Sequence, residues 1–397
     1  MKSTLTTLLL IILLSACKVQ KPSTSYHDDT IRLEKDSLST IKLATLDTLV
    51  KVEIDSSRFQ DSVQIEVHRI IKDTIHIIGV GDIMMGTNFP NESYLPPNNG
   101  NYLFKDVEDI LKNADVTFGN LEGVILNEGG TQKYCKNPKL CYLFRTPEQY
   151  MENLVNAGFD VMSTANNHAG DFGEEGRQSS MKLLDSVGIY HAGLLSQPYV
   201  TFKIDGMKYG FAAFSPNTGT SSIHNTSRAI EIIQHLDTIS DIVIASFHGG
   251  AEGSKYQHVT RKTETFYGEN RGNVYTFSHT LIDAGADVIF GHGPHVTRAI
   301  EIYKKRFIAY SLGNFCTYAR FNLSGDNGLA PIVNVATNSS GEFLKASITP
   351  IVQYRPGGPK IDSQKRVIQR LIELTKKDFP EVPIKIDPSG IITYIEN

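Results

Sequence analysis

Short apolar runs alternate with amphipathic segments along most of the chain after residue 73. Runs rich in Val, Ile and Phe predict buried strands at residues 75–80, 114–118, 159–163, 241–247 and 286–290. Segments in which apolar residues recur at helical spacing predict helices at residues 104–113, 147–157, 228–236 and 274–284. This alternation of helix and strand predicts layers of α/β structure.

One pair of strands departs from the alternation. The apolar runs at residues 199–204 and 209–214 flank Asp205-Gly206, a dipeptide that is typical of a tight β-hairpin turn. A hairpin next to alternating helices and strands indicates a mixed sheet, with both parallel and antiparallel neighbours.

The first seventeen residues have the pattern of a bacterial export signal. Lys2 precedes an apolar run at residues 8–14 that is too short to span a bilayer, and small residues then lead to Cys17. This arrangement resembles a lipobox, in which Cys17 is acylated and the acyl chains anchor the protein in a membrane. The alternative is an ordinary cleaved signal with an incidental cysteine. Lys18 is not the Asp that often marks retention in the inner membrane, which favours the outer membrane.

Composition divides the chain into four parts. We expect a signal peptide at 1–17, a tether at 18–72, the main domain at 73–355 and a C-terminal extension at 356–397. The tether is rich in Ser, Thr, Asp and Lys, although residues 63–71 alternate and could form an edge strand or a helix instead. The extension contains a predicted helix at 363–377 and a strand at 391–395, which we expect to pack on the main domain.

Net charge and cysteine content limit the kinds of molecule that the protein is expected to bind. The 397 residues carry a formal net charge of −4 without a basic block, so no nucleic acid partner is expected. Cys135 and Cys141 flank a proline-containing turn and could close a disulfide loop in an oxidising compartment, or remain two free thiols. A zinc-finger interpretation lacks a second Cys/His pair at the required spacing.

Polar residues of metal-binding type follow five of the predicted strands. They are Asp82, Asn120, Glu122, Asn167, His168, His248, Glu252, His292 and His295. The carboxyl ends of strands are where α/β sheets place their functional groups. Carboxylate, amide oxygen and imidazole are ligands that suit Mn, Zn or Fe. We therefore expect a site for one or two divalent transition metal ions, which could activate a water molecule.

Six short blocks make this expectation specific. They are Gly81-Asp82-Ile83-Met84-Met85-Gly86, Gly119-Asn120-Leu121-Glu122, Ala165-Asn166-Asn167-His168 with Asp171 and Gly173, His248-x-Gly-x-Glu252, Gly291-His292-Gly293-Pro294-His295 and Tyr310-Ser311-Leu312-Gly313-Asn314-Phe315. In kind and order they resemble the CapA-type capsule synthesis proteins, a branch of the calcineurin-like metallophosphatase superfamily. The resemblance covers residues 74–350 and implies a four-layer αββα sandwich, in which two mixed sheets lie face to face between helices.

The resemblance also implies roles for individual residues. The expected metal ligands are Asp82, Asn120, Glu122, Asn167, His248, His292 and His295, and His168 is the expected general acid. Glu122 is the expected bridging carboxylate, because Asn120 stands where the wider superfamily has Asp. Glu252 and Asn314 are expected to support the site. Two alternatives stay open: a role for Asn120 as a turn residue only, and a role for Glu252 in positioning His248 only.

Two departures from the family pattern affect the expected metal site. Met84 stands where the superfamily has a His ligand, and Gly293 stands in the middle of a block that commonly reads Gly-His-His-Pro-His. A thioether is a poor ligand for a hard divalent ion. The sequence therefore leaves two functions open. One is a metal-dependent hydrolase that acts on a phosphoester or amide bond in the synthesis, release or export of poly-γ-glutamate or another capsule polymer. The other is a non-catalytic protein that binds the polymer. In both, the partners are the polymer, its export machinery and a membrane.

Overall fold

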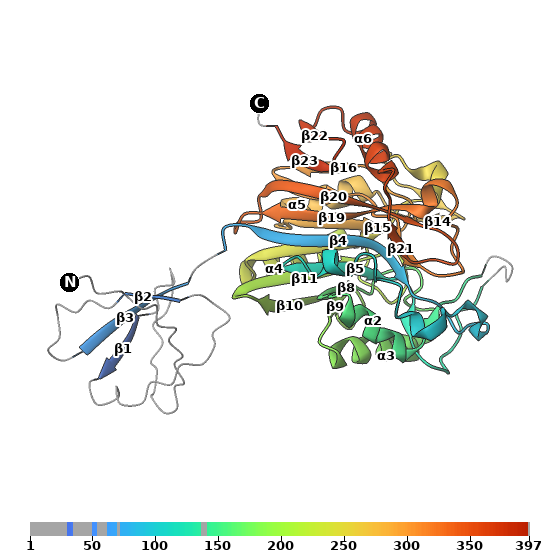
Figure 1. The fold of residues 1–397 in the computed structure, drawn as a ribbon, viewed down its shortest axis with the longest axis horizontal. Coiled ribbons are helices and arrows are strands. Elements are labelled where there is room, and N and C mark those ends of the chain that lie inside the picture. The colour runs from blue at the N-terminus through green and yellow to red at the C-terminus, as the bar shows by residue number, and fades with distance from the viewer. Residues whose placement is uncertain (1–29, 35–49, 54–61, 70–71, 136–140, 396–397) are drawn as a thin grey trace. The chain divides into compact units, whose positions relative to one another are not determined.

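The computed structural model describes residues 30–34, 50–53, 62–69, 72–135 and 141–395. The chain divides into two units, Met1–Lys72 and Asp73–Asn397. In the first unit β3 (Ser62–Arg69) pairs antiparallel with both β1 (Thr30–Glu34) and β2 (Val50–Glu53) (Figure 1). Residues 62–69 thus form a central strand. The predicted signal peptide and Cys17 lie outside the described residues.

The second unit is built on two mixed sheets. The six-stranded sheet has the order β10 (Tyr199–Ile204), β11 (Met207–Phe214), β12 (Ile242–His248), β15 (Val288–His292), β17 (Arg306–Ala309), β16 (Ile300–Tyr303). The ten-stranded sheet has the order β22 (Ile384–Ile386), β23 (Ile391–Tyr394), β20 (Phe343–Gln353), β19 (Leu329–Thr337), β4 (Ile75–Met84), β5 (Val116–Leu121), β8 (Val161–Ser163), β9 (Tyr190–Ala192), with β18 (Asn314–Thr317) beside β4 and β21 (Pro359–Ile361) beside β20. Two short pairs complete the strands: β6 (Val124–Ile125) with β7 (Arg145–Thr146), and β13 (Thr265–Phe266) with β14 (Glu269–Asn270).

Helices cover the outer faces of both sheets. The ten-stranded sheet packs against α1 (Glu108–Leu111), α2 (Met151–Asn156) and α3 (Gly173–Ser186), and the six-stranded sheet packs against α4 (Thr226–Ile239) and α5 (Val274–Asp283). A third core lies between the sheets, where the rings of Phe118 and Phe290 stack with centroids 5.2 Å apart. These layers confirm the predicted four-layer αββα architecture (Figure 1).

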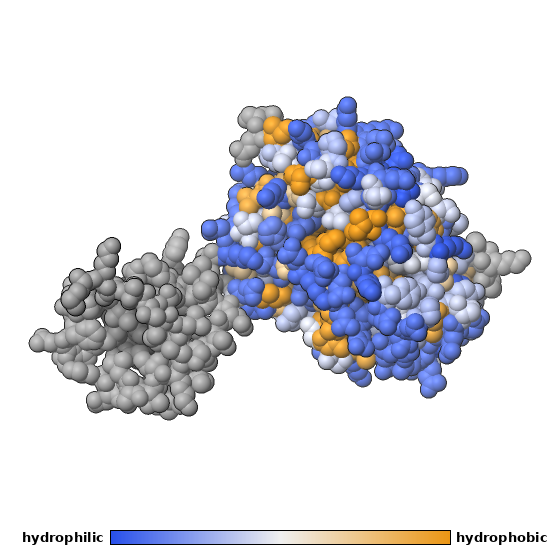
Figure 2. All heavy atoms as spheres, in the orientation of Figure 1, coloured by the Kyte–Doolittle hydropathy of each residue, from blue (hydrophilic) through white to orange (hydrophobic). Residues whose placement is uncertain are grey.

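The C-terminal segment belongs to this unit. α6 (Arg366–Asp378) buries Val367, Ile368 and Leu371 in the core between the sheets, and β23 extends the ten-stranded sheet. The predicted helix and strand are both present. On the face drawn in Figure 2, hydrophilic residues cover most of this unit and hydrophobic ones gather in small groups. No helix in the described ranges is long and apolar enough to cross a bilayer.

The predicted hairpin at residues 199–214 is confirmed as the antiparallel pair β10–β11. The predicted helix at 104–113 is wrong in extent, because only Glu108–Leu111 is helical. Before it the chain forms successive turns, in which Leu103 N donates to Gly100 O and Val107 N donates to Phe104 O, both at 2.9 Å. Bonds that span three residues present apolar side chains at almost the same spacing as a helix, so the pattern alone does not separate the two.

Four aspartates form hydrogen bonds that join the starts of parallel strands to their neighbouring strands. Each directly precedes a strand, and its backbone N–H and carboxylate both bond one residue of the neighbouring strand. The four pairs are Asp115 with His76, Asp160 with Thr117, Asp241 with Lys208 and Asp287 with Val243, with donor–acceptor distances of 2.7 to 3.0 Å. These reciprocal bonds fix the register of strands whose opposite ends carry the candidate site.

Candidate metal centre

The strand ends bring residues from distant parts of the sequence together. Parallel pairing places Asp82 of β4 opposite Asn120 of β5, and His248, the last residue of β12, opposite His292, the last residue of β15. Glu122 follows β5 directly. All five side chains are buried. The rim of the two sheets therefore holds two carboxylates, an amide and two imidazoles away from water.

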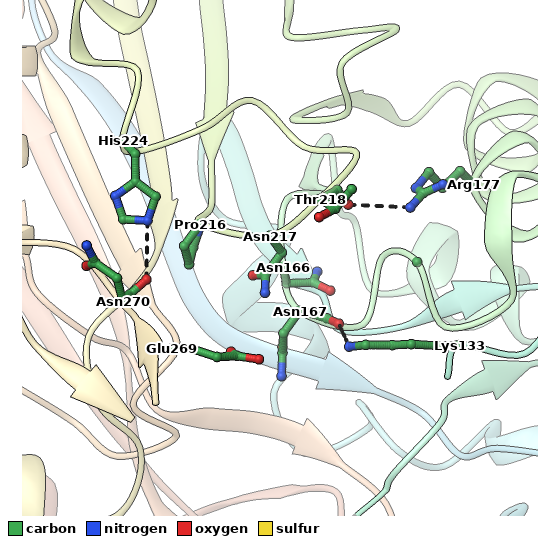
Figure 3. Close-up of a pocket in the computed structure, with 11 residues that line it drawn as sticks. Lys133, Asn166, Asn167, Arg177, Pro216, Asn217, Thr218, His224, Glu269 and Asn270 are labelled. Carbon is green, nitrogen blue, oxygen red and sulfur yellow. Dashed lines mark hydrogen bonds between the residues drawn. The ribbon is translucent and has the colours of Figure 1, made fainter. Parts of the chain in front are cut away.

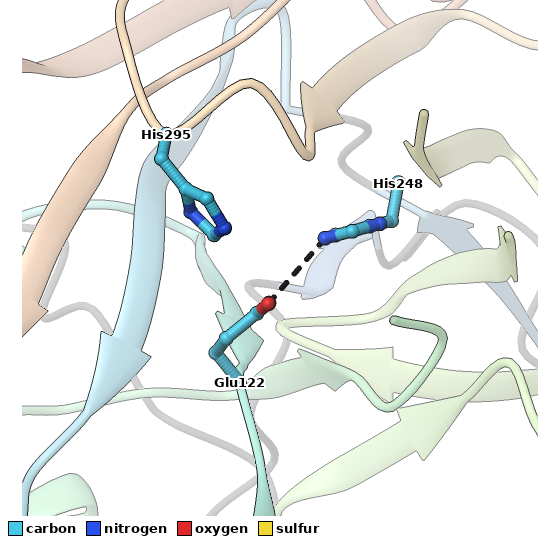
Figure 4. Close-up of side chains that lie close together, drawn as sticks. All are labelled: Glu122, His248 and His295. Carbon is cyan, nitrogen blue, oxygen red and sulfur yellow. Dashed lines mark ion pairs between the residues drawn. The ribbon is translucent and has the colours of Figure 1, made fainter. Parts of the chain in front are cut away.

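Three side chains form a group that could hold a metal ion. One ligand atom each from Glu122, His248 and His295 lies within 4.8 Å of the others (Figure 4). Nε2 of His248 is 3.4 Å from Oε1 of Glu122, and the two imidazole rings have centroids 6.3 Å apart. In Figure 4 the three side chains converge from separate segments on one point.

Asp82 lies behind this group and orients its neighbours. Its carboxylate is 3.1 Å from Nδ1 of His292 and 2.8 Å from Nδ1 of His295, and accepts a 2.8 Å bond from the amide of Asn120. Asn120 also donates to Glu122 at 2.6 Å. Both ends of its amide are engaged, because Oδ1 accepts a 3.3 Å bond from Asn166. Here Asn120 links the two carboxylates through hydrogen bonds.

The surroundings keep the carboxylates charged. Burial opposes ionisation of Asp82, but hydrogen bonds from His292 and His295 outweigh it and hold the pKa of Asp82 well below its usual value. Burial likewise opposes ionisation of Glu122, yet the charge of His248 holds its pKa below the usual value. Burial lowers the pKa of His248 itself. For His295, burial is outweighed by Asp82, which raises its pKa to about 9.

Several polar atoms at the rim have no hydrogen-bond partner among the residues that the structure describes. They are Oε1 of Glu122, both ring nitrogens of His248 and Nε2 of His292, all buried. Buried polar groups are nearly always hydrogen-bonded, so an unpaired cluster of acceptors needs an explanation. A divalent cation held by Glu122, His248 and His295 would satisfy Oε1 of Glu122 and one ring nitrogen of His248. Carboxylate oxygen and imidazole nitrogen suit Mn, Zn or Fe. The residues present therefore fit a metal ion.

His168 is held by a carboxylate of its own. Its Nδ1 is 2.7 Å from Oδ2 of Asp171, which also accepts a 2.8 Å bond from the backbone N–H of Phe144. The ring of Phe144 packs on that of His168, with centroids 4.2 Å apart. The backbone N–H of His168 donates to Asn166 at 3.0 Å, which connects it through Asn120 to both carboxylates. This arrangement leaves Nε2 of His168 free of Asp171.

The remaining predicted residues lie around this rim. Oδ1 of Asn167 is buried without a partner in the described part of the chain, as expected of a ligand that awaits an ion. Asn314 donates to the carbonyl oxygens of His295, at 3.1 Å, and of Asn327, at 3.0 Å, so it supports the loop that carries His295. Glu252 forms an ion pair with Arg271, with Oε1 3.0 Å from Nη1.

Two buried arginines, which the sequence did not suggest, hold the loop after His248. Arg298 makes two 2.8 Å bonds to the carboxylate of Glu264, which accepts the N–H of Ala251 at 2.9 Å. Arg271 donates to the carbonyl of Gly250 at 3.1 Å. No local pattern marks these contacts, because the partners lie more than ten residues apart.

The two departures from the family pattern have structural explanations. The sulfur of Met84 accepts a 3.3 Å bond from the N–H of Gly86 and packs with Phe144, Phe321 and Leu323, so position 84 contributes to an apolar wall. Gly293 has φ +114°, and a Cβ there would lie 2.7 Å from the carbonyl oxygen of Gly249. The loop therefore requires glycine at this position.

A disulfide joins Cys135 and Cys141, whose intervening residues 136–140 lie outside the described chain. Both cysteines pack with the apolar cluster that contains Phe172. On one side of the disulfide, the N–H of Lys133 donates to the carbonyl of Asp171 at 2.9 Å. On the other, Phe144 contacts His168. The crosslink thus joins two segments that contact the His168–Asp171 pair.

A rim of buried carboxylates and imidazoles on two facing mixed sheets is an arrangement that could hold a divalent metal ion. The chain belongs to the family of bacterial capsule synthesis proteins PGA_cap, whose model matches residues 76–319. The capsule biosynthesis protein CapA of Bacillus anthracis is 29% identical over 246 residues, which are 59% of this chain and 58% of that protein, less than two thirds of its length. The PGA biosynthesis protein CapA of Bacillus subtilis is 28% identical over 77% of this chain and 78% of its own.

The solved structures to which this chain is similar include 5'-nucleotidases. A putative 5'-nucleotidase from Staphylococcus aureus has a TM-score of 0.41 and 11% identity, with 79% of this chain and 59% of that chain covered. A 5'-nucleotidase precursor from Thermus thermophilus has a TM-score of 0.37 and 12% identity, with 76% of this chain and 59% of that chain covered.

Proposed function

We propose that this protein is a metal-dependent hydrolase of the bacterial cell envelope that cleaves a capsule polymer of the poly-γ-glutamate type. The observation that carries the proposal is the buried group of Glu122, His248 and His295, whose unpaired atoms fit a cation. Membership of the capsule synthesis family supports the polymer as substrate.

The chain offers a defined set of ligands. Glu122, His248 and His295 would hold the ion, and the buried free atoms of His292 and Asn167 extend the set toward a second position. Asp82 fixes the rings of His292 and His295 through their Nδ1 atoms. A bound divalent ion would supply a Lewis acid and a water molecule of lowered pKa.

His168 would act as the general acid. Asp171 binds Nδ1, which leaves Nε2 to give a proton to the leaving group, the amine of an amide bond or the oxygen of a phosphoester. Phe144 covers one face of the ring and limits its motion. The bond from the N–H of His168 to Asn166 fixes the segment relative to the metal ligands.

Analysis of the full-length protein tests this proposal. We expect near-stoichiometric Mn, Zn or Fe after mild purification, and hydrolysis of γ-glutamyl polymer. His168→Gln should lower turnover by about 100-fold or more while metal content is retained. His258→Gln, at an exposed His that pairs with Asp378, is the matched control and should change neither. Full turnover by His168→Gln would remove His168 from the mechanism.

A second candidate is a non-catalytic protein that binds the polymer during its export. The observation that favours it is Met84, which supplies an apolar contact where the superfamily has a ligand. Wild-type protein that binds the polymer, lacks metal and shows no turnover with added Mn or Zn would establish this alternative.

We also propose that Cys17 anchors the exported protein in a membrane and that residues 18–72 separate the second unit from it. Cys17→Ser should release the protein from the membrane fraction. Retention of this variant in the membrane would contradict the anchor.

A further inference from the structure

A polar cleft of about 560 Å³ lies among the residues drawn in Figure 3. Residues that line it include Lys133, Asn166, Asn167, Arg177, Asn217 and Asn270. Asn166 donates a hydrogen bond to Asn120, which itself donates to Asp82 and Glu122, so one residue that lines the cleft also contacts the metal centre's hydrogen-bond network. The cleft therefore lies where the part of a substrate next to the reacting bond would bind.

Arg177 is built into the wall of this cleft. Its guanidinium lies between Gly170 and Gly219, where a Cβ on either glycine would come within 2.7 Å of Nη2. Nη1 is 3.2 Å from Glu174, and Nη2 donates a long 3.4 Å bond to the carbonyl of Thr218 (Figure 3). Nε is buried and has no hydrogen-bond partner among the described residues. The guanidinium thus keeps donors available for a ligand.

Lys133 supplies a second positive charge near the metal centre. Its Nζ donates to the backbone carbonyl of Asn167 at 2.8 Å, a contact that Figure 3 shows. An ammonium group has three N–H donors, so this bond positions the charge and leaves other donors for a ligand. The acid in the cleft is Glu269, whose exposed carboxylate lies 4.0 Å from Nη1 of Arg271, so its charge is partly balanced.

Amide groups line the space between these charges. Asn166, Asn217 and Asn270 line the cleft, and Oδ1 of Asn217 is buried and lacks a hydrogen-bond partner in the part of the chain that is described. An asparagine side chain both donates and accepts, so it pairs well with the N–H and C=O of an amide-linked chain. A cleft with two cations and asparagine side chains, one with an unpaired oxygen, matches a ligand that carries carboxylates on an amide backbone.

A second hollow adjoins this cleft. His224 and Asn270 line both this cleft and a neighbouring groove of about 230 Å³, whose other walls include Thr226, Thr263 and Asn273. Nε2 of His224 is 3.2 Å from the carbonyl of Asn270. The two hollows thus adjoin at His224 and Asn270, and we call the two together the track.

We propose that this track binds an acidic, amide-linked polymer as an extended chain, with Lys133 and Arg177 binding carboxylates next to the bond at the metal centre. The inference rests on the proposed function for the nature of the polymer. It adds the residues that select the polymer by its carboxylates, and a binding mode that spans several polymer units.

The inference is tested by measuring how γ-linked glutamate oligomers of two, four and eight units bind to the full-length protein. A chelator first removes the metal from the protein, so that the oligomers are not cleaved. We expect affinity to rise with length. Lys133→Gln and Arg177→Gln should each weaken binding of the octamer by about tenfold or more, the loss typical of one charge-assisted hydrogen bond. Arg177→Lys keeps the positive charge but loses the planar pair of N–H donors of the guanidinium. Its affinity for the octamer should lie between those of the wild type and Arg177→Gln.

Matched controls separate this role from a general effect of charge or stability. Arg228 of α4 is exposed and pairs with Glu231 three residues away, much as Arg177 pairs with Glu174, so Arg228→Gln should bind the octamer like the wild type. Neutral γ-linked glutamine oligomers should bind weakly and equally to wild type and variants. Urea unfolding of each variant would show whether it is folded.

The outcomes distinguish the inference from the proposed function. Equal binding of the octamer by wild type, Lys133→Gln and Arg177→Gln would overturn the roles of these residues and leave the hydrolase intact. Equally tight binding of a phosphodiester polymer of similar charge would overturn carboxylate selection. A wild-type protein that holds metal and hydrolyses simple phosphoesters but binds no oligomer would overturn both the track and the polymer substrate.

Discussion

The two ends of the same parallel strands use similar polar residues in opposite ways. At their starts, Asp160 and Asp287 each make a reciprocal pair of hydrogen bonds to the neighbouring strand. At the other ends of the neighbouring strands β5 and β12, Glu122 and His248 are more deeply buried and keep atoms without partners among the described residues. One end satisfies its polar groups internally. The other leaves them for a ligand.

The electrostatics of the two ends differ in the same way. Burial raises the pKa of both Asp160 and Asp287 to about 6, since no adjacent cation fully compensates for the loss of water. Asp82 and Glu122 are more deeply buried, yet imidazoles hold their pKa values below the usual range. Negative charge is therefore costly at Asp160 and Asp287 and stabilised at Asp82 and Glu122.

The largest expected effect comes from removing the support of the rim. Arg298→Ala leaves the buried Glu264 without its partner, and we expect the free energy of unfolding to fall by about 3–5 kcal/mol. The loop after His248 should loosen as well and lower metal content. Urea unfolding and elemental analysis measure the two effects.

Two further variants test whether the loss of stability comes from a buried charge that is left without its partner. Arg298→Met combined with Glu264→Leu removes both charges and should cost less than Arg298→Ala alone. Arg228→Ala breaks an exposed ion pair and should cost less than about 1 kcal/mol. If Arg298→Ala behaved like Arg228→Ala, the buried pair would not support the rim.

A second prediction compares the two ends with the same chemical change. Glu122→Gln keeps the size of the side chain but removes a charged candidate ligand. The metal affinity should therefore fall by more than the roughly 10- to 100-fold that is typical when a residue that only orients a ligand is changed. Asp160→Asn, the same change at a strand start, should leave metal affinity unaltered. Chelator competition measures both. Equal affinities for Glu122→Gln and wild type would place the metal elsewhere.

Much of this rim could be predicted because its residues follow recognisable strands. The runs at 241–247 and 286–290 predicted strands that end close to His248 and His292, and the structure has β12 and β15 end at those residues. Parallel neighbours in a sheet bring such ends together without further information. The family and the four-layer fold, both confirmed, were expected from the resemblance of the six short blocks to a known family, whereas the strand pattern alone predicted only layers of α/β structure.

Contacts between distant segments could not be predicted in this way. Arg298 and Glu264 are thirty-four residues apart and carry no periodic signal, and neither do Lys133 and Arg177 in the cleft. The double hydrogen bonding of Asn120 also depends on the relative positions of three strands and loops. The helix expected at 104–113 was wrong because successive turns give nearly helical spacing.

The smallest expected effect concerns stability at the strand starts. Asp160 has a pKa of about 6 in the folded protein against an ordinary value of 3.8, so the folded state holds a proton that the unfolded chain has lost. When the folded state binds more protons, the free energy of unfolding falls as pH rises, here from about 4 to about 6, and it stays lower above that range. The shift corresponds to at most about 3 kcal/mol.

Asp160→Asn removes this dependence on pH, because the amide oxygen can still accept the N–H of Thr117 but never ionises. The neutral bond is weaker, so we expect a net gain of about 1–2 kcal/mol at pH 8 and a loss or no change at pH 4. Urea unfolding at several pH values measures the difference, with the exposed Asp109→Asn as control. A difference between Asp160→Asn and wild type that stays constant across this range would show that Asp160 ionises normally. The contrast between the two ends of the strands would then rest on hydrogen bonding alone.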